Sequence, residues 1–299
     1  MTSKVFHSAA STTPKPHKGY GMKVARISDG VRFATAIVTE THARLVEPWR
    51  DGEPMLAPFF LPSGQATADP VGITRALTGL RFLPPLNAAT KVICLGLNYR
   101  DHIAEVGKQA PPSNPALFAK FPDALVGHGE PLLRPRVSSH FDFEGEIALV
   151  IGRSGRHIPK SEAMAYVYGF TLLMDGSVRD YQQHSPTAGK CFHRSGAIGP
   201  WIVTCDALGD YSRLALETRL NGNLVQSGRV DQMIYDIPTV IEYVSSWTPL
   251  SPGDIISTGT PSGVGCSRKP PLWLRPRDVI EVSVAGIGTL QNIVADEAR

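Results

Sequence analysis

The sequence predicts an α+β fold that is dominated by strands. Its apolar residues fall mainly in short runs rich in Val and Ile, bounded by Gly, Pro and charged residues, which is typical of strands between turns. The chain carries 25 Pro and 28 Gly against 19% charged residues, so turns are frequent. The expected strands do not alternate regularly with helices, and this argues against a doubly wound parallel sheet.

Strand and helix positions follow from the apolar runs and the turn signals. Two hairpins are indicated, by SDGVRF (28–33) and by Asn221-Gly222, because Asp-Gly and Asn-Gly favour the tight turns that join antiparallel strands. Helices are expected at 68–80, 99–107, 160–166 and 236–246. Strands after the N-terminal region are expected at 91–97, 144–151, 168–174, 199–205, 214–220, 254–258 and 278–284.

Composition divides the chain into three parts. Residues 1–21 contain no acid and little apolar content, so a disordered leader is expected. Residues 22–85 are expected to form a small N-terminal β/α domain, with several strand runs followed by the short helix that Gly79 ends. The Pro-rich LPPL then marks a boundary, and residues 86–299 are expected to form the main domain.

The overall charge and the cysteines exclude several classes of protein. The formal net charge is +3 with no dense Lys/Arg block, which argues against nucleic acid as a partner. No run of about 18 apolar residues occurs, so no membrane span is expected. The four cysteines lack CxxC spacing and predict reduced thiols, with neither a zinc site nor disulfides. We therefore expect a cytoplasmic protein, although the acid-free leader leaves an organelle open.

Glu144 and Glu146, in FDFEGEIALVIG, form the most informative pattern in the chain. Side chains two apart in a strand share one face, so two carboxylates meet at the start of an apolar strand. Such close like charges repel unless a cation lies between them, and oxygen ligands suit Mg²⁺ or Mn²⁺. The alternative is a solvent-facing sheet edge with two unrelated acids.

Asp175 is the candidate for a third carboxylate, because it ends the apolar strand in YVYGFTLLMD and so points toward a pocket. Asp180, five residues on, competes for this role. Because Asp180 follows Arg179 directly, an ion pair or a cap of the next segment is the better interpretation of it.

Three further patterns indicate chemistry, each with a simpler alternative. His102 and Glu105 would share one helix face, either as a general-base pair in which the carboxylate orients the imidazole or as an exposed pair. Lys190 lies in an expected loop, where its ammonium would hold a substrate carboxylate or an enolate oxygen, or would simply be solvated. In the glycine-rich TGTPSGVG, backbone N–H groups and the hydroxyls of Thr258 and Thr260 would bind an anion, unless the segment is only a turn.

The order of these patterns resembles the fumarylacetoacetate hydrolase family over roughly residues 90–295. The blocks that carry the resemblance are GLNYRDHIAE, NPALFAKFPDALVG, DFEGEIALVIGR, YGFTLLMDGSVRDYQ, IGPWIV and LSPGDIISTGTPSGVG. The resemblance implies a mixed β-roll with a small N-terminal domain, and a homodimer. It also implies Mg²⁺ or Mn²⁺ held by Glu144, Glu146 and Asp175.

The same resemblance assigns roles to other residues. His102 and Glu105 become the catalytic dyad of a lid helix, and Lys190 becomes the third catalytic residue. Phe118 and Lys120 are placed near the pocket wall, with Lys120 in a structural or ligand-positioning role only. Substrate contacts are assigned to Thr260, Gly259, Arg179 and Tyr99.

The chain departs from the family pattern at two places. Gly145 stands between the paired glutamates where many members have a bulkier residue, and this should not disturb metal ligation because that position faces away. After Lys190 the chain reads CFHRS (191–195) instead of Phe-Asp-Thr-Phe. His193 and Arg194 would bind an extra substrate carboxylate or would be surface residues.

The resemblance predicts a metal-dependent hydrolase that cleaves a C–C bond in a β-diketo acid of the acylpyruvate or fumarylpyruvate type. His102, oriented by Glu105, would activate water, and the metal and Lys190 would stabilise the enolate that leaves. An oxaloacetate-type decarboxylase or a hydroxymuconate-type isomerase using the same metal site is the alternative. A non-catalytic, metal-stabilised binding protein is a second alternative, and a small 2-oxo or diketo acid is the expected partner of the enzyme.

Overall fold

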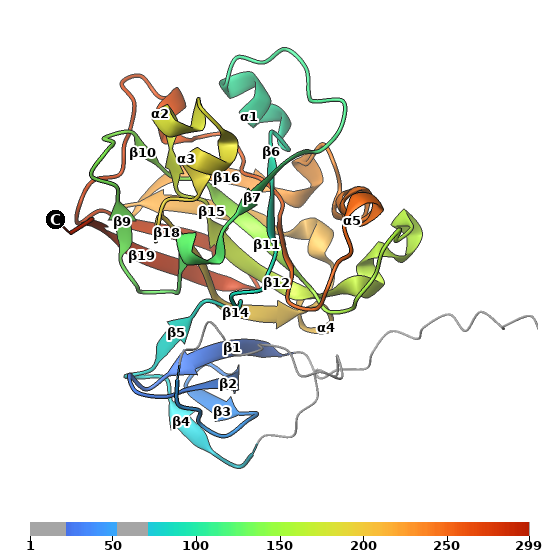
Figure 1. Cartoon of the computed structure of the whole chain (residues 1–299), viewed down its shortest axis with the longest axis vertical. Coiled ribbons are helices and arrows are strands. Elements are labelled where there is room, and N and C mark those ends of the chain that lie inside the picture. Colours follow the sequence, from blue (N-terminus) through green and yellow to red (C-terminus); the bar gives the residue numbers. More distant parts are fainter. Residues whose placement is uncertain (1–21, 53–70, 299) are drawn as a thin grey trace, which may run out of the picture.

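The computed structural model describes residues 22–52 and 71–298, which form a β-rich α+β fold, as predicted (Figure 1). Most of the described strands belong to one large sheet: β1 (Lys23–Ser28), β2 (Phe33–Val38), β3 (His42–Leu45), β4 (Thr74–Ala76), β5 (Arg81–Leu83), β6 (Val92–Gly96), β7 (Ala116–Lys120), β8 (Leu125–Val126), β11 (Gly145–Ile151), β12 (Val167–Met174), β14 (Gly196–Thr204) and β17 (Ile255–Ser257). A second sheet contains β9 (Leu132–Arg134), β15 (Ala215–Leu220), β16 (Asn223–Arg229), β18 (Val279–Val284) and β19 (Gly288–Asp296).

The remaining described elements are short. A ribbon pairs β10 (Phe141–Asp142) with β13 (Ser177–Val178). The α-helices are α1 (Arg100–Glu105), α2 (Arg179–Gln182), α3 (Pro186–Lys190), α4 (Cys205–Leu208) and α5 (Ile237–Trp247). The 3-10 helices are η2 (Pro122–Ala124), η3 (Lys160–Tyr166), η4 (Tyr211–Arg213), η5 (Val230–Gln232) and η6 (Gly265–Ser267).

The two sheets pack face to face around the central strands of the large one. The large sheet runs in the order β4-β3-β2-β1-β14-β12-β11-β17-β6-β7, and the second sheet in the order β16-β15-β18-β19-β9. Strand β11 contacts β15, β12 contacts β18, and β14 contacts β19. Strand β11 is therefore covered on both faces, which explains why its sequence is an unbroken apolar run after Glu146.

Alternation along β11 assigns its residues to two different faces. Ile147 and Leu149 belong to the core between the two sheets, whereas Ala148 and Val150 pack in a second cluster on the other face. Glu146 has the same parity as Ala148 and therefore lies on that second face. The predicted site must therefore form on the face of the large sheet that is turned away from the second sheet.

The longest described helix, α5, closes one side of the core. Its side chains at Ile237, Val240, Ile241 and Val244 are buried at the spacing of one helical face. Asp236 caps the helix by accepting a hydrogen bond from the backbone N–H of Thr239 at 2.9 Å. The prediction of a helix at 236–246 is thereby confirmed, and the helix predicted at 160–166 is the 3-10 helix η3.

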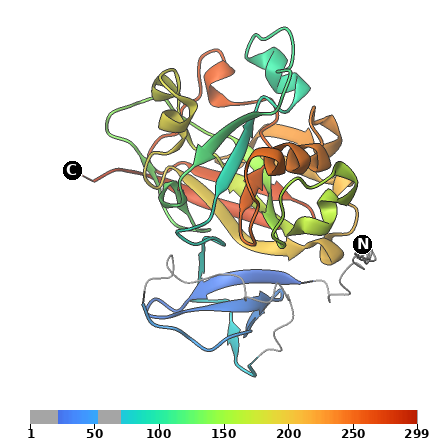
Figure 2. The ribbon, with the colours of Figure 1, turned by 45° about the vertical axis from the view of Figure 1, so that its right-hand side comes forward.

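The N-terminal strands extend the large sheet and form the lower layer in Figures 1 and 2. Strand β1 pairs with β2 and β5 within this layer and with β14 of the main body. Backbone pairing therefore continues from the N-terminal strands into the main body of the protein. The domain boundary expected near residue 85 stays a prediction. The expected leader at 1–21 lies outside the described residues.

The helix predicted at 68–80 is wrong over its described part, residues 71–80. This stretch contains β4, which pairs with β3, and the N–H of Leu45 donates to the carbonyl of Ile73 at 2.9 Å. Gly79, at φ +83°, belongs to a turn and does not end a helix. The backbone groups offered by the edge of β3 outweighed a weak helical pattern, so the described N-terminal region is β structure rather than β/α.

Both predicted hairpins are present. Strands β1 and β2 are joined through the SDGVRF turn, and β15 and β16 through Asn221-Gly222. Asn221 and Gly222 adopt φ angles of +51° and +79°, the left-handed conformation that a two-residue hairpin turn requires. Local turn chemistry was therefore sufficient to locate both hairpins.

The structure also bears on membrane-spanning helices and on cysteine pairing. None of the helices in the described ranges has the length and apolar character that a bilayer crossing demands. The four cysteines are all unpaired in the described structure.

Gly145 offers a test of how tightly the two sheets are packed. It faces β15, away from the neighbouring glutamates as predicted, and a Cβ there would overlap Thr218 Oγ1 and lie 3.3 Å from Val282 Cγ2. We expect Gly145→Ala to lower the free energy of unfolding by about 1–3 kcal/mol through overpacking. Adding Thr218→Ala, which removes the overlapping hydroxyl, should restore much of this loss. Urea unfolding of both variants measures the effect, and equal destabilisation of the single and double variants would contradict it.

Candidate metal centre and active site

The pairing register of β11 and β12 brings the three predicted carboxylates together. Gly145 pairs with Met174 and the strands are antiparallel, so Glu144 lies opposite Asp175, whose backbone N–H donates to the Glu144 carbonyl at 2.8 Å. Residues directly opposite in an antiparallel pair share a face. Glu144, Glu146 and Asp175 are all buried, and each offers a carboxylate oxygen within 4.8 Å of the others. The alternative of two unrelated exposed acids is therefore wrong.

Two buried lysines meet this cluster. Lys190 Nζ lies 2.6 Å from Glu144 Oε2 and 2.8 Å from Asp175 Oδ2, and Lys120 Nζ lies 2.7 Å from Asp175 Oδ1. Lys190 is the last residue of helix α3, so the expected loop is a short helix, which Ser185 caps. Lys120 ends β7 and also donates to the carbonyl of Lys190, which fits the ligand-positioning role expected for it.

Arg179 holds Glu144 from the other side. Its Nε donates to Asp142 Oδ2 at 2.8 Å, one terminal nitrogen lies 2.7 Å from Glu144 Oε1, and the other donates to Gln182 Oε1 at 2.9 Å. Every nitrogen of this guanidinium thus faces a protein oxygen. The structure links Arg179 to a carboxylate of the cluster, and the substrate contact assigned to it stays a prediction.

Counting charges shows which acid lacks a counterion. Asp142, Glu144, Glu146 and Asp175 face only three basic groups, those of Lys120, Lys190 and Arg179. Among the residues that the structure describes, no Lys or Arg forms an ion pair with Glu146. Its Oε2 accepts a hydrogen bond from the Ser257 hydroxyl, and its buried Oε1 has no partner in the described chain.

The protonation behaviour of the two glutamates follows from these contacts. Burial, and then the charges of Asp175 and Glu144, raise the pKa of Glu146 well above its usual range. Burial also opposes ionisation of Glu144, but the charges of Lys190, Arg179 and His102 prevail and lower its pKa to about 2. A doubly charged cation beside Glu146 would supply the missing compensation, and an all-oxygen ligand set suits a hard divalent ion. The donor set therefore fits the predicted metal.

The predicted dyad lies close enough to the cluster for His102 to affect the pKa of Glu144. In helix α1, His102 Nδ1 lies 3.1 Å from Glu105 Oε2, and Glu105 Oε1 accepts a hydrogen bond from the Gly263 N–H at 2.8 Å. Only 7% of His102 is exposed, so the alternative of a solvent-exposed pair is wrong. An ionised carboxylate can only accept, so Nδ1 is the ring nitrogen that carries a hydrogen toward Glu105, and Nε2 is the nitrogen left for another partner.

The glycine-rich loop is built into the protein more firmly than a bare turn. The Thr258 hydroxyl donates to the carbonyl of Ile147, and the Thr260 hydroxyl donates to the carbonyl of Gly145 at 2.9 Å. Thr260 Oγ1 also accepts from Gln226, so its only hydroxyl proton is committed. The backbone N–H groups of Gly259 and Thr260 find no acceptor within residues 22–52 and 71–298, and the substrate contacts expected of these two residues stay a prediction.

The remaining candidates lie deeper or farther away. Tyr99 precedes α1 and is 1% exposed, and burial raises the pKa of its hydroxyl, which hydrogen-bonds Thr258. Asp180 accepts a hydrogen bond from Ser138 and is outside the three-carboxylate cluster, as expected. Arg194 pairs with Glu130 at 3.0 Å and His193 is exposed, so neither contacts the described acidic cluster.

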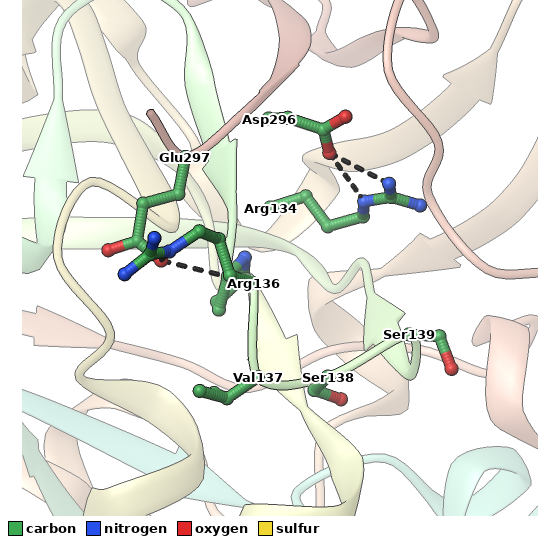
Figure 3. A pocket seen from close by; sticks show the side chains of 8 residues that line it. Arg134, Arg136, Val137, Ser138, Ser139, Asp296 and Glu297 are labelled. Atoms are coloured by element: carbon green, nitrogen blue, oxygen red, sulfur yellow. Dashed lines mark hydrogen bonds and ion pairs between the residues drawn. The ribbon is translucent and has the colours of Figure 1, made fainter. Parts of the chain in front are cut away.

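A surface hollow of about 540 Å³ lies apart from this chemistry (Figure 3). It is bounded by residues 134–139 and by the C-terminal pair Asp296 and Glu297. Arg134 pairs with Asp296 at 2.8 Å, so acids already compensate the positive charge that the hollow presents. None of the predicted site residues lines it.

Several residues that build the site escaped the sequence analysis. Asp142 supports Arg179, Gln226 holds Thr260, and Ser257 holds Glu146. Asp142 precedes Glu144 by two residues, so the same alternation that paired the glutamates was a signal for it. Gln226 and Ser257 come from distant strands and carry no local signal.

A buried acidic centre with one uncompensated charge, faced by a carboxylate-oriented histidine, is the arrangement of a metal-dependent enzyme. The chain belongs to the fumarylacetoacetate hydrolase family: the family model described as "Fumarylacetoacetate (FAA) hydrolase C-terminal" matches residues 91–295. The family resemblance of the sequence is thereby confirmed.

Curated relatives include several oxaloacetate tautomerases. The mitochondrial oxaloacetate tautomerase Fahd2a of Rattus norvegicus is 41% identical over 216 residues, which cover 71% of this chain and 69% of that one. The oxaloacetate tautomerase YisK of Bacillus subtilis is 41% identical over 222 residues, which cover 73% of this chain and 74% of that one.

Solved structures of family members share the fold. A fumarylacetoacetate hydrolase from Exiguobacterium antarcticum matches with a TM-score of 0.78 and 34% identity, over 92% of this chain and all of that one. A 2-hydroxyhepta-2,4-diene-1,7-dioate isomerase from Mycobacterium marinum matches with a TM-score of 0.76 and 32% identity, over 93% of this chain and all of that one.

Replacing Glu146 by Gln should have opposite effects with and without metal. The amide replaces a buried acid that, without metal, must either stay charged with no counterion or take up a proton at a free-energy cost. The metal-free variant should therefore melt above the metal-free wild type, by roughly 2–4 °C per kcal/mol of this cost removed. Mg²⁺ or Mn²⁺ should raise the melting temperature of the wild type but not that of the variant.

Thermal melts of EDTA-treated protein, with and without added metal, test both expectations: the higher melting temperature of the metal-free variant and its lack of response to metal. Asp180→Asn is the matched control, because it also replaces an acid by its amide but lies outside the cluster. A metal-induced rise in the melting temperature of Glu146→Gln as large as that of the wild type would refute the assignment.

Proposed function

We propose that this chain is a divalent-metal-dependent tautomerase or isomerase of a small 2-oxo dicarboxylic acid such as oxaloacetate. The reaction moves one proton between the 2-oxygen and carbon 3, and the double bond shifts between the C2–C3 and C2–O positions. No group is gained or lost. The observation that carries the proposal is the buried Glu146, the one acid of the cluster that no described basic side chain compensates. The choice of reaction is supported by the names of the relatives called oxaloacetate tautomerase and of the structurally similar isomerase.

Glu144, Glu146 and Asp175 would hold Mg²⁺ or Mn²⁺. When bound, such an ion supplies the positive charge that lowers the energy of an enolate oxygen. Lys190 adds a second positive charge at the same place, because its ammonium already touches Glu144 and Asp175. This combination makes removal of a proton from a carbon next to a carbonyl feasible near neutral pH.

His102 is the group that would carry the proton. With Nδ1–H directed at Glu105, its Nε2 is free to accept a proton from the enol oxygen or from carbon 3 and to return it to the other position. Glu105 stabilises the imidazolium that forms for a moment, and the Gly263 N–H holds Glu105 in place. The helix position of both residues fixes their mutual geometry.

Gly259 and Thr260 would bind a carboxylate or oxo group of the substrate through their backbone N–H groups. These donors are backbone groups, so no side chain has to move for them to bind. The hydroxyls of Thr258 and Thr260 hold the loop in place, and Gly259 within it adopts φ +90°. The substrate contacts assigned to Tyr99 and Arg179, the homodimer and the cytoplasmic location stay predictions.

Hydrolysis of a C–C bond in an acylpyruvate or fumarylpyruvate is the second candidate. It is favoured by the complete His102–Glu105 dyad and by the likeness to the hydrolase from Exiguobacterium antarcticum. Both reactions pass through an enolate, but only hydrolysis consumes water and yields two acids. Decarboxylation of oxaloacetate would release pyruvate and CO₂ through the same kind of enolate.

His102→Gln should abolish proton transfer while leaving the metal ligands intact. We expect the rate of enol–keto interconversion of oxaloacetate to fall about 10²–10⁴-fold, the usual contribution of a general base. Glu105→Gln should have a smaller effect in the same direction, since it disturbs only the orientation of the ring. The rate is measured by NMR, which monitors exchange of the carbon-3 hydrogens in D₂O. The sample contains Mg²⁺ instead of Mn²⁺.

The same NMR experiment separates the candidate reactions. A tautomerase exchanges the carbon-3 hydrogens faster than buffer without forming pyruvate, whereas a decarboxylase forms pyruvate in step with exchange. Efficient cleavage of an acylpyruvate with no acceleration of oxaloacetate exchange would overturn the proposed tautomerase in favour of the hydrolase.

A further inference from the structure

Asp142 is a fully buried acid that lies outside the three-carboxylate cluster. Its Oδ1 accepts hydrogen bonds from the backbone N–H groups of Phe143 and Gly265, both at 2.8 Å. Its Oδ2 accepts from Cys266 N–H at 2.9 Å and from Arg179 Nε at 2.8 Å. One carboxylate therefore satisfies four donors that come from three separate segments of the chain.

Through Arg179, Asp142 reaches a predicted metal ligand. The guanidinium lies between Asp142 Oδ2 and Glu144 Oε1, at 2.8 Å from the first and 2.7 Å from the second. Nε donates a hydrogen bond to Asp142, and one terminal nitrogen forms an ion pair with Glu144. A planar, forked cation can contact two different acids in this way, whereas the single ammonium of a lysine has no such fork. The position of Glu144 therefore depends on a contact that Asp142 makes.

Through Gly265 and Cys266, Asp142 also contacts the turn that holds Glu105 of the catalytic dyad. Gly263, two residues before Gly265, donates its N–H to Glu105, and its carbonyl accepts from Arg268. Asp142 fixes the far end of this short turn, so displacement of the turn would move the group that orients Glu105. The metal cluster and the dyad share one buried anchor.

We propose that Asp142 is a positioning residue that sets Glu144 for the metal and the 263–266 turn for Glu105. This inference rests on the proposed function, because it assumes that Glu144 is a metal ligand. A carboxylate is required at this position because all four of its partners are donors. In asparagine, an NH₂ group would replace the carboxylate oxygen that faces Cys266 N–H and Arg179. An NH₂ group only donates, so it cannot accept hydrogen bonds from these two donors.

The test compares metal affinity in Asp142→Asn, Arg179→Lys and the double variant, measured by calorimetric titration of EDTA-treated protein with Mn²⁺. We expect Asp142→Asn to weaken the Kd for Mn²⁺ about 10–100-fold, as for other groups that orient ligands. Arg179→Lys keeps the charge but cannot bridge two acids, so it should weaken the Kd as well. Because Asp142 acts on Glu144 through Arg179, the double variant should be no weaker than the weaker single variant.

Two controls separate positioning from general destabilisation. Asp180→Asn, next to Arg179 in sequence but outside this network, should leave the Kd unchanged. Melting temperatures show that each variant is folded, and Arg179→Lys, at a partly exposed side chain, keeps the test available if Asp142→Asn does not fold. At saturating Mn²⁺, Asp142→Asn should also lower kcat, because the seat of Glu105 has moved.

Each outcome bears on the inference. A wild-type Kd in Asp142→Asn or in Arg179→Lys, or strictly multiplicative losses in the double variant, would overturn it. Failure of the proposed function is a separate result: a wild type that binds no Mn²⁺ removes the metal site, and one that binds Mn²⁺ without turnover removes the reaction while leaving Asp142 testable.

Discussion

The pairing register between β11 and β12 is the constraint on which the rest of the site depends. It sets Glu144 opposite Asp175 on the face that Glu146 also occupies, so three buried carboxyl groups meet there. A slip of one residue would turn Glu146 into the core between the sheets and separate the cluster. Two apolar clusters, one on each face of β11, oppose that slip, because it would exchange the residues of both.

Much of the surrounding structure can be understood as compensation for this concentration of charge. Lys120 arrives from β7, Lys190 from the end of α3 and Arg179 from the start of α2, so three elements distant in sequence each supply one cation. A cluster that needed only stability would have had a fourth cation or one acid fewer, since an unpaired buried charge is costly. The unpaired Glu146 is the kind of local conflict that proteins keep at functional sites.

Local patterns were enough to predict the acids and the dyad, but not their supports. Alternation paired Glu144 with Glu146, and helical spacing paired His102 with Glu105, because both patterns lie within a few residues of sequence. The contacts of Gln226 with Thr260 and of Ser257 with Glu146 depend on how distant strands align, which no local window contains. The same limit explains the error at 71–80, where pairing with β3 overrode a weak helical pattern.

The burial of the dyad bears on which enolate reaction this site favours. Hydrolysis needs a water molecule held between His102 and the carbonyl under attack, whereas tautomerisation needs only a base that reaches two atoms of one substrate. In this structure α1 is seated on the glycine-rich loop through Glu105 and Gly263, and a second contact joins Asp101 to the hydroxyl of Ser262 at 2.9 Å. His102 is only 7% exposed, so little of the proposed base is open to bulk solvent. A closed dyad of this kind suits the return of a proton to carbon better than the admission of water.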